Sequence, residues 1–281
     1  QLEFIKHFSP DILVYTNISP DHLDRHGSME EYINMKLNAL MNMKHEGQIV
    51  YNKDDTILEK VLSPFPHKKQ PFSTKSKDVL YKIENNNIIG PSDDKLLNID
   101  ELSIPGEHNL QNFLAASTCS HLMGISQNQI VKSMKEFKGV EHRLEYVRTI
   151  NEADYINDSK ATNIDSVIVA INTYKQPIVL ILGGFNKGAN FRLLLPHIKS
   201  SHVRDIVSYG DAGGQINTAL GDAVRSVQVT DLSSAVKKAQ LMAAPGDIVL
   251  LSPGCASYDE FSNFEERGNH FKSIIKNLAA S

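Results

Sequence analysis

The residues best suited to chemistry lie in one short run, residues 157–163, which read Asn-Asp-Ser-Lys-Ala-Thr-Asn. The run offers a carboxylate, an ammonium group, two hydroxyls and two amides between two hydrophobic segments. Residues 155–156 before it are typical of a strand end, and residues 164–171 after it are typical of a helix. Ligand sites of open α/β sheets lie between strand ends and helix starts, so we expect a ligand here. The candidates for capping that helix are Thr162, Asn163 and Asp165.

Two other loops have a similar composition, residues 183–188 (Gly-Gly-Phe-Asn-Lys-Gly) and 252–257 (Ser-Pro-Gly-Cys-Ala-Ser). Glycines let the backbone approach a ligand, N–H groups at helix starts favour negative charge, and Lys160 and Lys187 add full cations. The three loops together are therefore predicted to hold an anion. For each loop alone, glycines that simply close a tight turn remain the alternative.

The first half of the chain holds other candidates. A loop at residues 21–26, which includes His22, has the carboxylates and imidazoles that suit a hard divalent cation, and a solvated turn is the alternative. Lys36 follows on a predicted helix, where a lysine is usually a surface residue. Asn109 and Asn112 share one face of a later helix, although capping explains Asn109 equally well.

Arg143 lies just after the predicted boundary between two domains. A guanidinium there could reach a phosphate held by the other domain, or it could form an ordinary interdomain ion pair. Cys255 has no histidine or basic neighbour in the sequence to activate its thiol, so we interpret it as a small packed residue.

Composition excludes several classes of protein. The chain has 281 residues, 41% of them hydrophobic, which is enough for the cores of two domains. The net charge of -4 and the scattered basic residues disfavour a nucleic-acid or membrane partner. No apolar run approaches the ~18 residues that span a bilayer, and we expect a cytoplasmic protein. The two cysteines, Cys119 and Cys255, are far apart, which disfavours a disulfide.

Hydrophobic periodicity predicts two domains that meet near Gly139. In the first, two strand–helix pairs precede a stretch of short antiparallel strands and a pair of helices. The predicted elements are a strand at 12–16, a helix at 29–43, a strand at 48–51, a helix at 56–62, the antiparallel strands within 65–102, and helices at 108–123 and 127–137.

The second domain shows five short β-rich runs, each followed by a helical pattern. Such repeats predict a doubly wound sheet whose strand ends, and therefore the three polar loops, meet at one edge. The predicted domains are residues 1–139 and 140–281. The predicted strands of the second are 154–157, 178–182, 206–209, 227–229 and 248–251.

Two motifs are absent from the sequence. No Gly-x-Gly-x-x-Gly follows a predicted strand, which weighs against a dinucleotide-dependent dehydrogenase. No Gly-x-x-x-x-Gly-Lys-Ser/Thr occurs either, so this stretch of sequence lacks a complete P-loop.

In their order, six blocks of this sequence resemble the Mur ligase family over nearly the whole chain. Within the family, residues 158–163 and 252–264 are most similar to the members that add D-glutamate. The resemblance implies an α/β fold, with a partial P-loop-type central ATPase domain that has an antiparallel β portion, followed by a Rossmann-like C-terminal domain. The six blocks are residues 17–25, 106–112, 142–143, 157–163, 183–188 and 251–259.

The resemblance implies a reaction that explains these residue types. ATP phosphorylates the carboxylate of UDP-N-acetylmuramoyl-L-alanine, and the amine of D-glutamate attacks the acyl phosphate, with Mg²⁺ as cofactor. The groups that react are mostly anionic, so the site has to supply cations and hydrogen-bond donors. A cytoplasmic, monomeric enzyme of peptidoglycan precursor synthesis is implied.

Site residues are carried over from the same blocks. His22 resembles a Mg²⁺ ligand, and Lys36 resembles the lysine that is carbamylated to orient a second Mg²⁺. Catalytic roles are implied for His22, Lys36 and Lys160. The positions that resemble ATP-binding residues are Asn109, Asn112, Arg143, Asp158 and Lys160. The positions that resemble the D-glutamate pocket are Thr162, Lys187, Ser257, Tyr258 and Phe264.

The sequence departs from the family pattern at its start, because the UDP-binding domain, the P-loop and a Mg²⁺-binding glutamate would lie before Gln1. We therefore expect a fragment that is inactive alone. The alternatives are another amino-acid ligase of the superfamily, including the folylpolyglutamate synthases, and a non-catalytic nucleotide-binding relative. A dehydrogenase is the weakest alternative.

Overall fold

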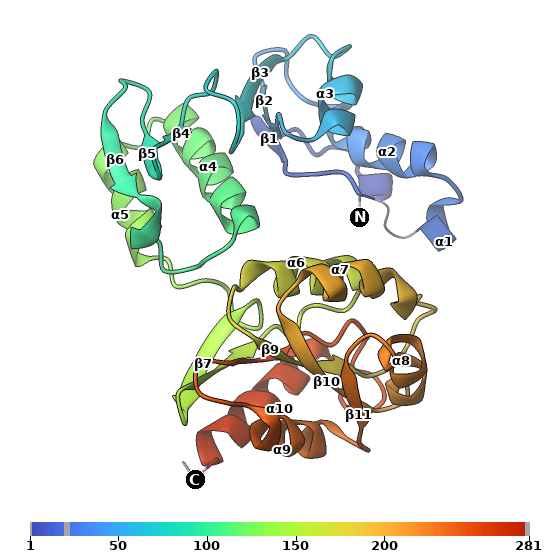
Figure 1. The fold of residues 1–281 in the computed structure, drawn as a ribbon. Helices are drawn as coiled ribbons and strands as arrows, with labels where there is room; N and C mark the ends of the chain where they lie inside the picture. The colour runs from blue at the N-terminus through green and yellow to red at the C-terminus, as the bar shows by residue number, and fades with distance from the viewer. Residues whose placement is uncertain (1, 20–22, 279–281) are drawn as a thin grey trace. The chain divides into compact units, whose positions relative to one another are not determined.

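The computed structural model describes residues 2–19 and 23–278, which form two compact units, Gln1–Lys138 and Gly139–Ser281 (Figure 1). Each unit has hydrophobic clusters of its own.

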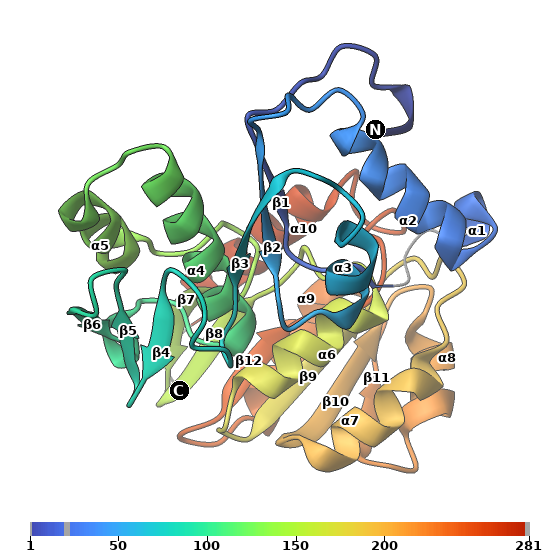
Figure 2. The ribbon, with the colours of Figure 1, turned by 90° about the horizontal axis from the view of Figure 1, so that it is seen from above.

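The first unit is built on a parallel sheet of order β1-β2-β3, with β1 at Ile12–Tyr15, β2 at Gln48–Asn52 and β3 at Lys68–Phe72. Successive residues of β2 face opposite sides of this sheet, since side chains alternate along a strand. Val50 packs in one cluster with Leu114, whereas Ile49 packs in the other with Leu58. Figure 2 shows the three strands side by side.

Helices flank this sheet. The predicted helix at 29–43 is shorter in the structure, because α2 ends at Leu37 and a 3-10 turn follows at Asn38–Leu40. Ser28 caps α2 by accepting a hydrogen bond from the N–H of Glu31. The elements around the sheet are a 3-10 turn at Leu2–Phe4, α1 at Leu23–His26, α2 at Met29–Leu37 and α3 at Thr56–Leu62.

A small antiparallel sheet and two helices complete the unit. The strands are β4 at Lys82–Glu84, β5 at Asn87–Ile89 and β6 at Lys95–Asn98, followed by a 3-10 turn at Ile99–Glu101, α4 at Glu107–Leu122 and α5 at Gln127–Glu136. The prediction of antiparallel strands within 65–102 is correct for these three and wrong for β3, which pairs in parallel with β2. β3 reads Lys-Lys-Gln-Pro-Phe and buries only Phe72, so its sequence shows little of a parallel strand.

The second unit contains a six-stranded sheet of order β11-β10-β9-β12-β8-β7. The five predicted strands are present and parallel, which confirms the doubly wound fold. An antiparallel edge strand, β7, was not predicted. The strands are β7 at Glu145–Ile150, β8 at Ala153–Asn157, β9 at Ile178–Gly183, β10 at Val203–Tyr209, β11 at Arg225–Gln228 and β12 at Ile248–Leu251.

Helices cover both faces of this sheet, α6 and α7 on one side and α9 and α10 on the other (Figure 1). β9 is buried along its whole length: Leu180 belongs to the first cluster and Val179 to the second. The helical elements are α6 at Ile164–Thr173, a 3-10 turn at Phe191–Leu194, α7 at Leu195–Ser200, α8 at Gly213–Leu220, α9 at Leu232–Met242 and α10 at Phe264–Asn277. In the part of the chain that is described, no helix is long and apolar enough to cross a bilayer.

Candidate active site in the second unit

Three loops meet at the carboxyl edge of the second sheet, as predicted, because β8, β9 and β12 are parallel neighbours. Backbone hydrogen bonds join them. Asp158 N donates to Leu251 O at 2.8 Å, Gly183 N to Pro253 O at 3.0 Å, and Gly254 N to Ala161 O at 2.9 Å. The loops 158–163, 183–188 and 252–257 therefore form one connected surface.

A short antiparallel bridge locks two of these loops together. Phe185 N donates to Ala256 O at 2.9 Å, and Ala256 N donates to Phe185 O at 3.1 Å. Gly184 allows this approach: its φ is +121°, and a Cβ there would lie 2.3 Å from Ala256 O. Lys187 and Tyr258, two residues beyond the bridge on each side, are therefore carried on backbone of defined geometry.

Arg267 of α10 supports the same loops from within, and sequence reasoning missed it. Its side chain is fully buried and donates to Ser159 Oγ and O and to the carbonyls of Cys255 and Ala256, at 2.8 to 3.2 Å. Spacing could have revealed it, because Arg267 precedes the buried Phe271 by four residues and so lies on the apolar face of the helix.

Asp158 lies beneath the surface of the first loop and is 5% exposed. Its carboxylate accepts a hydrogen bond from Ser252 Oγ at 2.8 Å and from Leu144 N at 3.2 Å. Burial raises the pKa of Asp158 to about 7, against the smaller opposing effects of these bonds and of Arg143. The carboxylate is therefore held near its titration point at neutral pH.

Lys160 and Phe264 are brought together. The Lys160 ammonium lies 5.5 Å from the centre of the Phe264 ring, a cation–π distance. Both Lys160 and Thr162 are exposed, and Asn163 caps α6 by accepting from Ser166 N at 2.9 Å. Of the three capping candidates, Asn163 is the cap, so the Thr162 side chain is not committed to that role.

Lys187 and Tyr258 form a second cation–π pair, with the ammonium 5.1 Å from the ring centre. Both side chains are exposed, while the neighbouring Ser257 is buried. Burial raises the pKa of the Cys255 thiol to about 12, so it stays protonated at neutral pH and is no nucleophile. Both cysteines are free thiols.

The segment before β7 carries Arg143, which is exposed. Its neighbour His142 is buried and packs edge-on against Phe264, with ring centres 6.2 Å apart. The Asn157 amide nitrogen lies 3.0 Å from His142 Nδ1 and 2.9 Å from Glu145 Oε2, while its oxygen accepts from Ser159 N. Nδ1 must therefore accept, which assigns His142 as the neutral tautomer protonated at Nε2.

Gly268 of α10 makes room for this imidazole, because a Cβ there would lie 2.2 Å from His142 Nδ1. Replacing a helical glycine by alanine ordinarily stabilises a protein by about 1 kcal/mol. We expect Gly268→Ala instead to destabilise the second unit by about 1 to 3 kcal/mol, because the buried ring has to shift. Amide hydrogen exchange in β9 and β12 measures this change, with the exposed Ser273→Ala on the same helix as the control. An equal or greater stability of Gly268→Ala would contradict the packing argument.

The remaining predicted site residues belong to the first unit. Asn109 is buried on α4 and donates from Nδ2 to Pro105 O at 2.6 Å, while Asn112, one turn later, is exposed. Gly106 is the N-cap of α4, so the capping alternative for Asn109 is wrong. The Lys36 ammonium lies 5.2 Å from the Tyr32 ring centre. His22 lies outside the described residues.

The structure gives limited support for a metal site. Among residues 2–19 and 23–278, no three His, Cys, Asp or Glu side chains are grouped so that they could hold a metal ion. The proposed set depends on His22 and on a modified Lys36, and the described residues do not by themselves make up a Mg²⁺ site.

Comparison with known proteins identifies both units. Residues 1–120 match the Mur ligase middle domain, and residues 142–255 match the Mur ligase, glutamate ligase domain. The UDP-N-acetylmuramoylalanine--D-glutamate ligase of Clostridioides difficile is 43% identical over 283 residues, which cover 99% of this chain and 62% of that protein. The ligase of the same name from Christiangramia forsetii is 41% identical, over 99% of this chain and 64% of that protein. The chain thus spans less than two thirds of these relatives.

Solved structures show the same fold at low sequence identity. MurF ligase from Thermotoga maritima, in complex with ADP, is 16% identical with a TM-score of 0.69, covering 96% of this chain and 64% of that one. FolC from E. coli, in complex with DHPP and ADP, is 17% identical with a TM-score of 0.66, covering 96% of this chain and 62% of that one.

The two α/β units of this chain therefore share the fold of these solved structures. The chain belongs to the Mur ligase family, of which it carries the middle domain and the glutamate ligase domain.

Proposed function

We propose that the protein of which this chain is part joins D-glutamate to UDP-N-acetylmuramoyl-L-alanine at the expense of ATP, in peptidoglycan precursor synthesis. The observation that carries the proposal is the placement of Lys160 and Lys187 over aromatic rings at one sheet edge, on loops of a glutamate ligase domain. The relatives that match 99% of this chain bear that activity in their names.

The chemistry needs an activated acyl group, because a carboxylate does not react with an amine in water. ATP converts the carboxylate into an acyl phosphate, and the D-glutamate amine attacks its carbonyl carbon. Phosphate leaves with the bonding electrons of the C–O bond, and the amine loses a proton as the amide forms. Each reactant carries anionic groups, so exposed cations at the site lower the barrier by stabilising that charge.

We assign the nucleotide to Asn109, Asn112, Arg143, Asp158 and Lys160. Lys160 is exposed beside the start of α6, where backbone N–H groups also favour phosphate oxygens. Mg²⁺, when bound through His22 and a carbamylated Lys36, would neutralise phosphate charge. The cytoplasm is the proposed location, and a monomer the proposed state.

We assign D-glutamate to Thr162, Lys187, Ser257, Tyr258 and Phe264. The Lys187 ammonium is exposed and lies over the Tyr258 ring, so a substrate carboxylate can pair with it from the solvent side. Such pairing explains a preference for a dicarboxylic amino acid over a neutral one.

ADP release measured with UDP-N-acetylmuramoyl-L-alanine, D-glutamate, ATP and Mg²⁺ tests the function. The complete gene product should turn over only when both acceptor and D-glutamate are present. We propose that the 281-residue chain alone does not turn over, and robust activity of this chain would overturn that part. Activity with a folate acceptor, or with another amino acid in place of D-glutamate, would favour the other ligases of the superfamily.

Lys187→Met tests the amino-acid pocket in the complete protein. A lost charge-assisted hydrogen bond costs about 1.5 to 3 kcal/mol, so we expect the KM for D-glutamate to rise roughly 10- to 100-fold while the KM for ATP stays the same. Lys199→Met, at an exposed position of α7, is the control for the loss of a charge. An unchanged KM for D-glutamate in Lys187→Met would remove Lys187 from the pocket.

A further inference from the structure

The segment that carries Arg143 is held by side chains rather than by regular structure. Residues 139–144 precede β7, and within them His142 (φ +64°) and Leu144 (φ +45°) lie in the left-handed region. Non-glycine residues there cost about 1 kcal/mol each, so other contacts have to maintain the conformation. Two of these contacts are Leu144 N to Asp158 Oδ1 and Lys160 N to His142 O.

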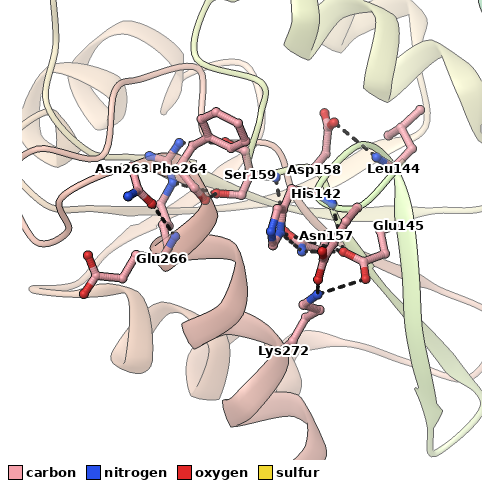
Figure 3. A network of polar contacts seen from close by, with 12 residues as sticks. His142, Leu144, Glu145, Asn157, Asp158, Ser159, Asn263, Phe264, Glu266 and Lys272 are labelled. Carbon is pink, nitrogen blue, oxygen red and sulfur yellow. Dashed lines mark hydrogen bonds and ion pairs between the residues drawn. The ribbon is translucent and has the colours of Figure 1, made fainter. Parts of the chain in front are cut away.

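Glu145 is the centre of the remaining contacts, as Figure 3 shows. Its Oε2 accepts from His142 N at 2.9 Å and from the Asn157 amide at 2.9 Å. Its carboxylate is only 24% exposed and needs a cation nearby. The imidazole of His142 does not supply the charge, because its Nδ1 accepts from Asn157.

Lys272 of α10 supplies that charge. Its ammonium lies 3.1 Å from Glu145 Oε1, pairs also with Glu141, and is 14% exposed. These two carboxylates lie on either side of Arg143 in the sequence. One lysine thereby ties both ends of the Arg143 segment to α10, the helix that also bears Phe264 and Arg267.

From this geometry we propose that Lys272 is a positioning residue for nucleotide binding, which holds Arg143 and, through Glu145 and Asn157, the neighbouring Asp158. The inference rests on the proposed function, because the role of Arg143 at the phosphates belongs to that proposal. Lys272 itself touches no substrate in this scheme.

The test uses Lys272→Met, Lys272→Arg and the control Lys276→Met, an exposed lysine one turn further along the same helix. In the complete protein, Lys272→Met should raise the KM for ATP about tenfold and leave kcat and the KM for D-glutamate within twofold. Lys272→Arg should restore most of the affinity, because a guanidinium can pair with the same carboxylates, and Lys276→Met should behave as wild type. An unchanged KM for ATP, or a rise in both KM values together, would overturn the proposal.

A second measurement separates this inference from the proposed function. Amide hydrogen exchange of His142 and Leu144 in the 281-residue chain should become at least tenfold faster in Lys272→Met, with the β9 amides unaffected. Unchanged exchange would overturn the positioning role even if ligation is observed. A wild-type complete protein without D-glutamate ligase activity would instead refute the proposed function, and the exchange data would still show whether Lys272 holds the segment.

Discussion

Arg267→Met is expected to lower the free energy of unfolding of the second unit by about 3 to 5 kcal/mol. Five hydrogen bonds from the guanidinium are lost. The carbonyls of Ser159 and Cys255 stay buried without these donors, whereas Ala256 O keeps its hydrogen bond from Phe185 N. Each unpaired buried acceptor costs about 1 to 3 kcal/mol, and relief from burying a cation offsets part of the sum. Amide hydrogen exchange in β9 and β12 is the measurement, because those strands open only when the unit unfolds.

Arg192→Met is the matched control, since Arg192 is exposed and its loss should change stability by less than about 0.5 kcal/mol. Arg267→Lys should recover little, because a lysine ammonium cannot reproduce the planar fork that reaches two loops at once. If Arg267→Met is as stable as Arg192→Met, the guanidinium is not what joins the loops.

Asp158→Asn should remove a pH dependence of stability. The carboxyl has a pKa of about 7 in the folded protein against 3.8 ordinarily, so the folded state holds the proton more tightly. Stability from this group is therefore fully present below about pH 4, falls as the pH rises to about 7, and is constant above that. The difference corresponds to about 4 kcal/mol, since one pKa unit is worth about 1.4 kcal/mol.

The measurement compares unfolding free energies of wild type and Asp158→Asn from pH 4 to pH 8. Asparagine can accept from Leu144 N and donate to Ser252 Oγ, so the variant keeps both contacts. Between pH 4 and pH 7, we expect the unfolding free energy of Asp158→Asn to rise steadily relative to that of wild type. Asp165→Asn, at an exposed position of α6, should show no such relative rise. Parallel pH profiles for wild type and Asp158→Asn would show that Asp158 titrates normally.

The sheet edge could be predicted from sequence because its signals are local. β9 and β12 are short apolar runs, each followed by small and polar residues, and parallel strands bring such loops together without further information. β7 escaped prediction because it is an edge strand in which only Ile150 is buried. β7 pairs in an antiparallel manner with β8, and a tight turn joins the two strands.

Contacts between distant residues could not be predicted in the same way. The Arg267 bonds to Ser159 span 108 positions, and the Lys272 pair with Glu145 spans 127. Their geometry depends on how α10 packs on the sheet, which no local pattern of charges reveals. Conversely, the sequence around Lys36 suggested either a surface lysine or, by resemblance, a carbamylated lysine that orients Mg²⁺. The position of its ammonium over the Tyr32 ring is consistent with either role.

The strand β9 contributes side chains to both hydrophobic clusters of the second unit, and β12 does the same. Because the same two strands separate the two clusters, we expect both clusters to unfold together in one cooperative transition. A compound that binds anywhere on the three loops at the carboxyl edge of the sheet would then raise the melting temperature of the whole unit. A ligand at a hundred times its Kd adds about 2.7 kcal/mol, so a simple thermal-shift screen becomes a practical way to find inhibitors of this surface.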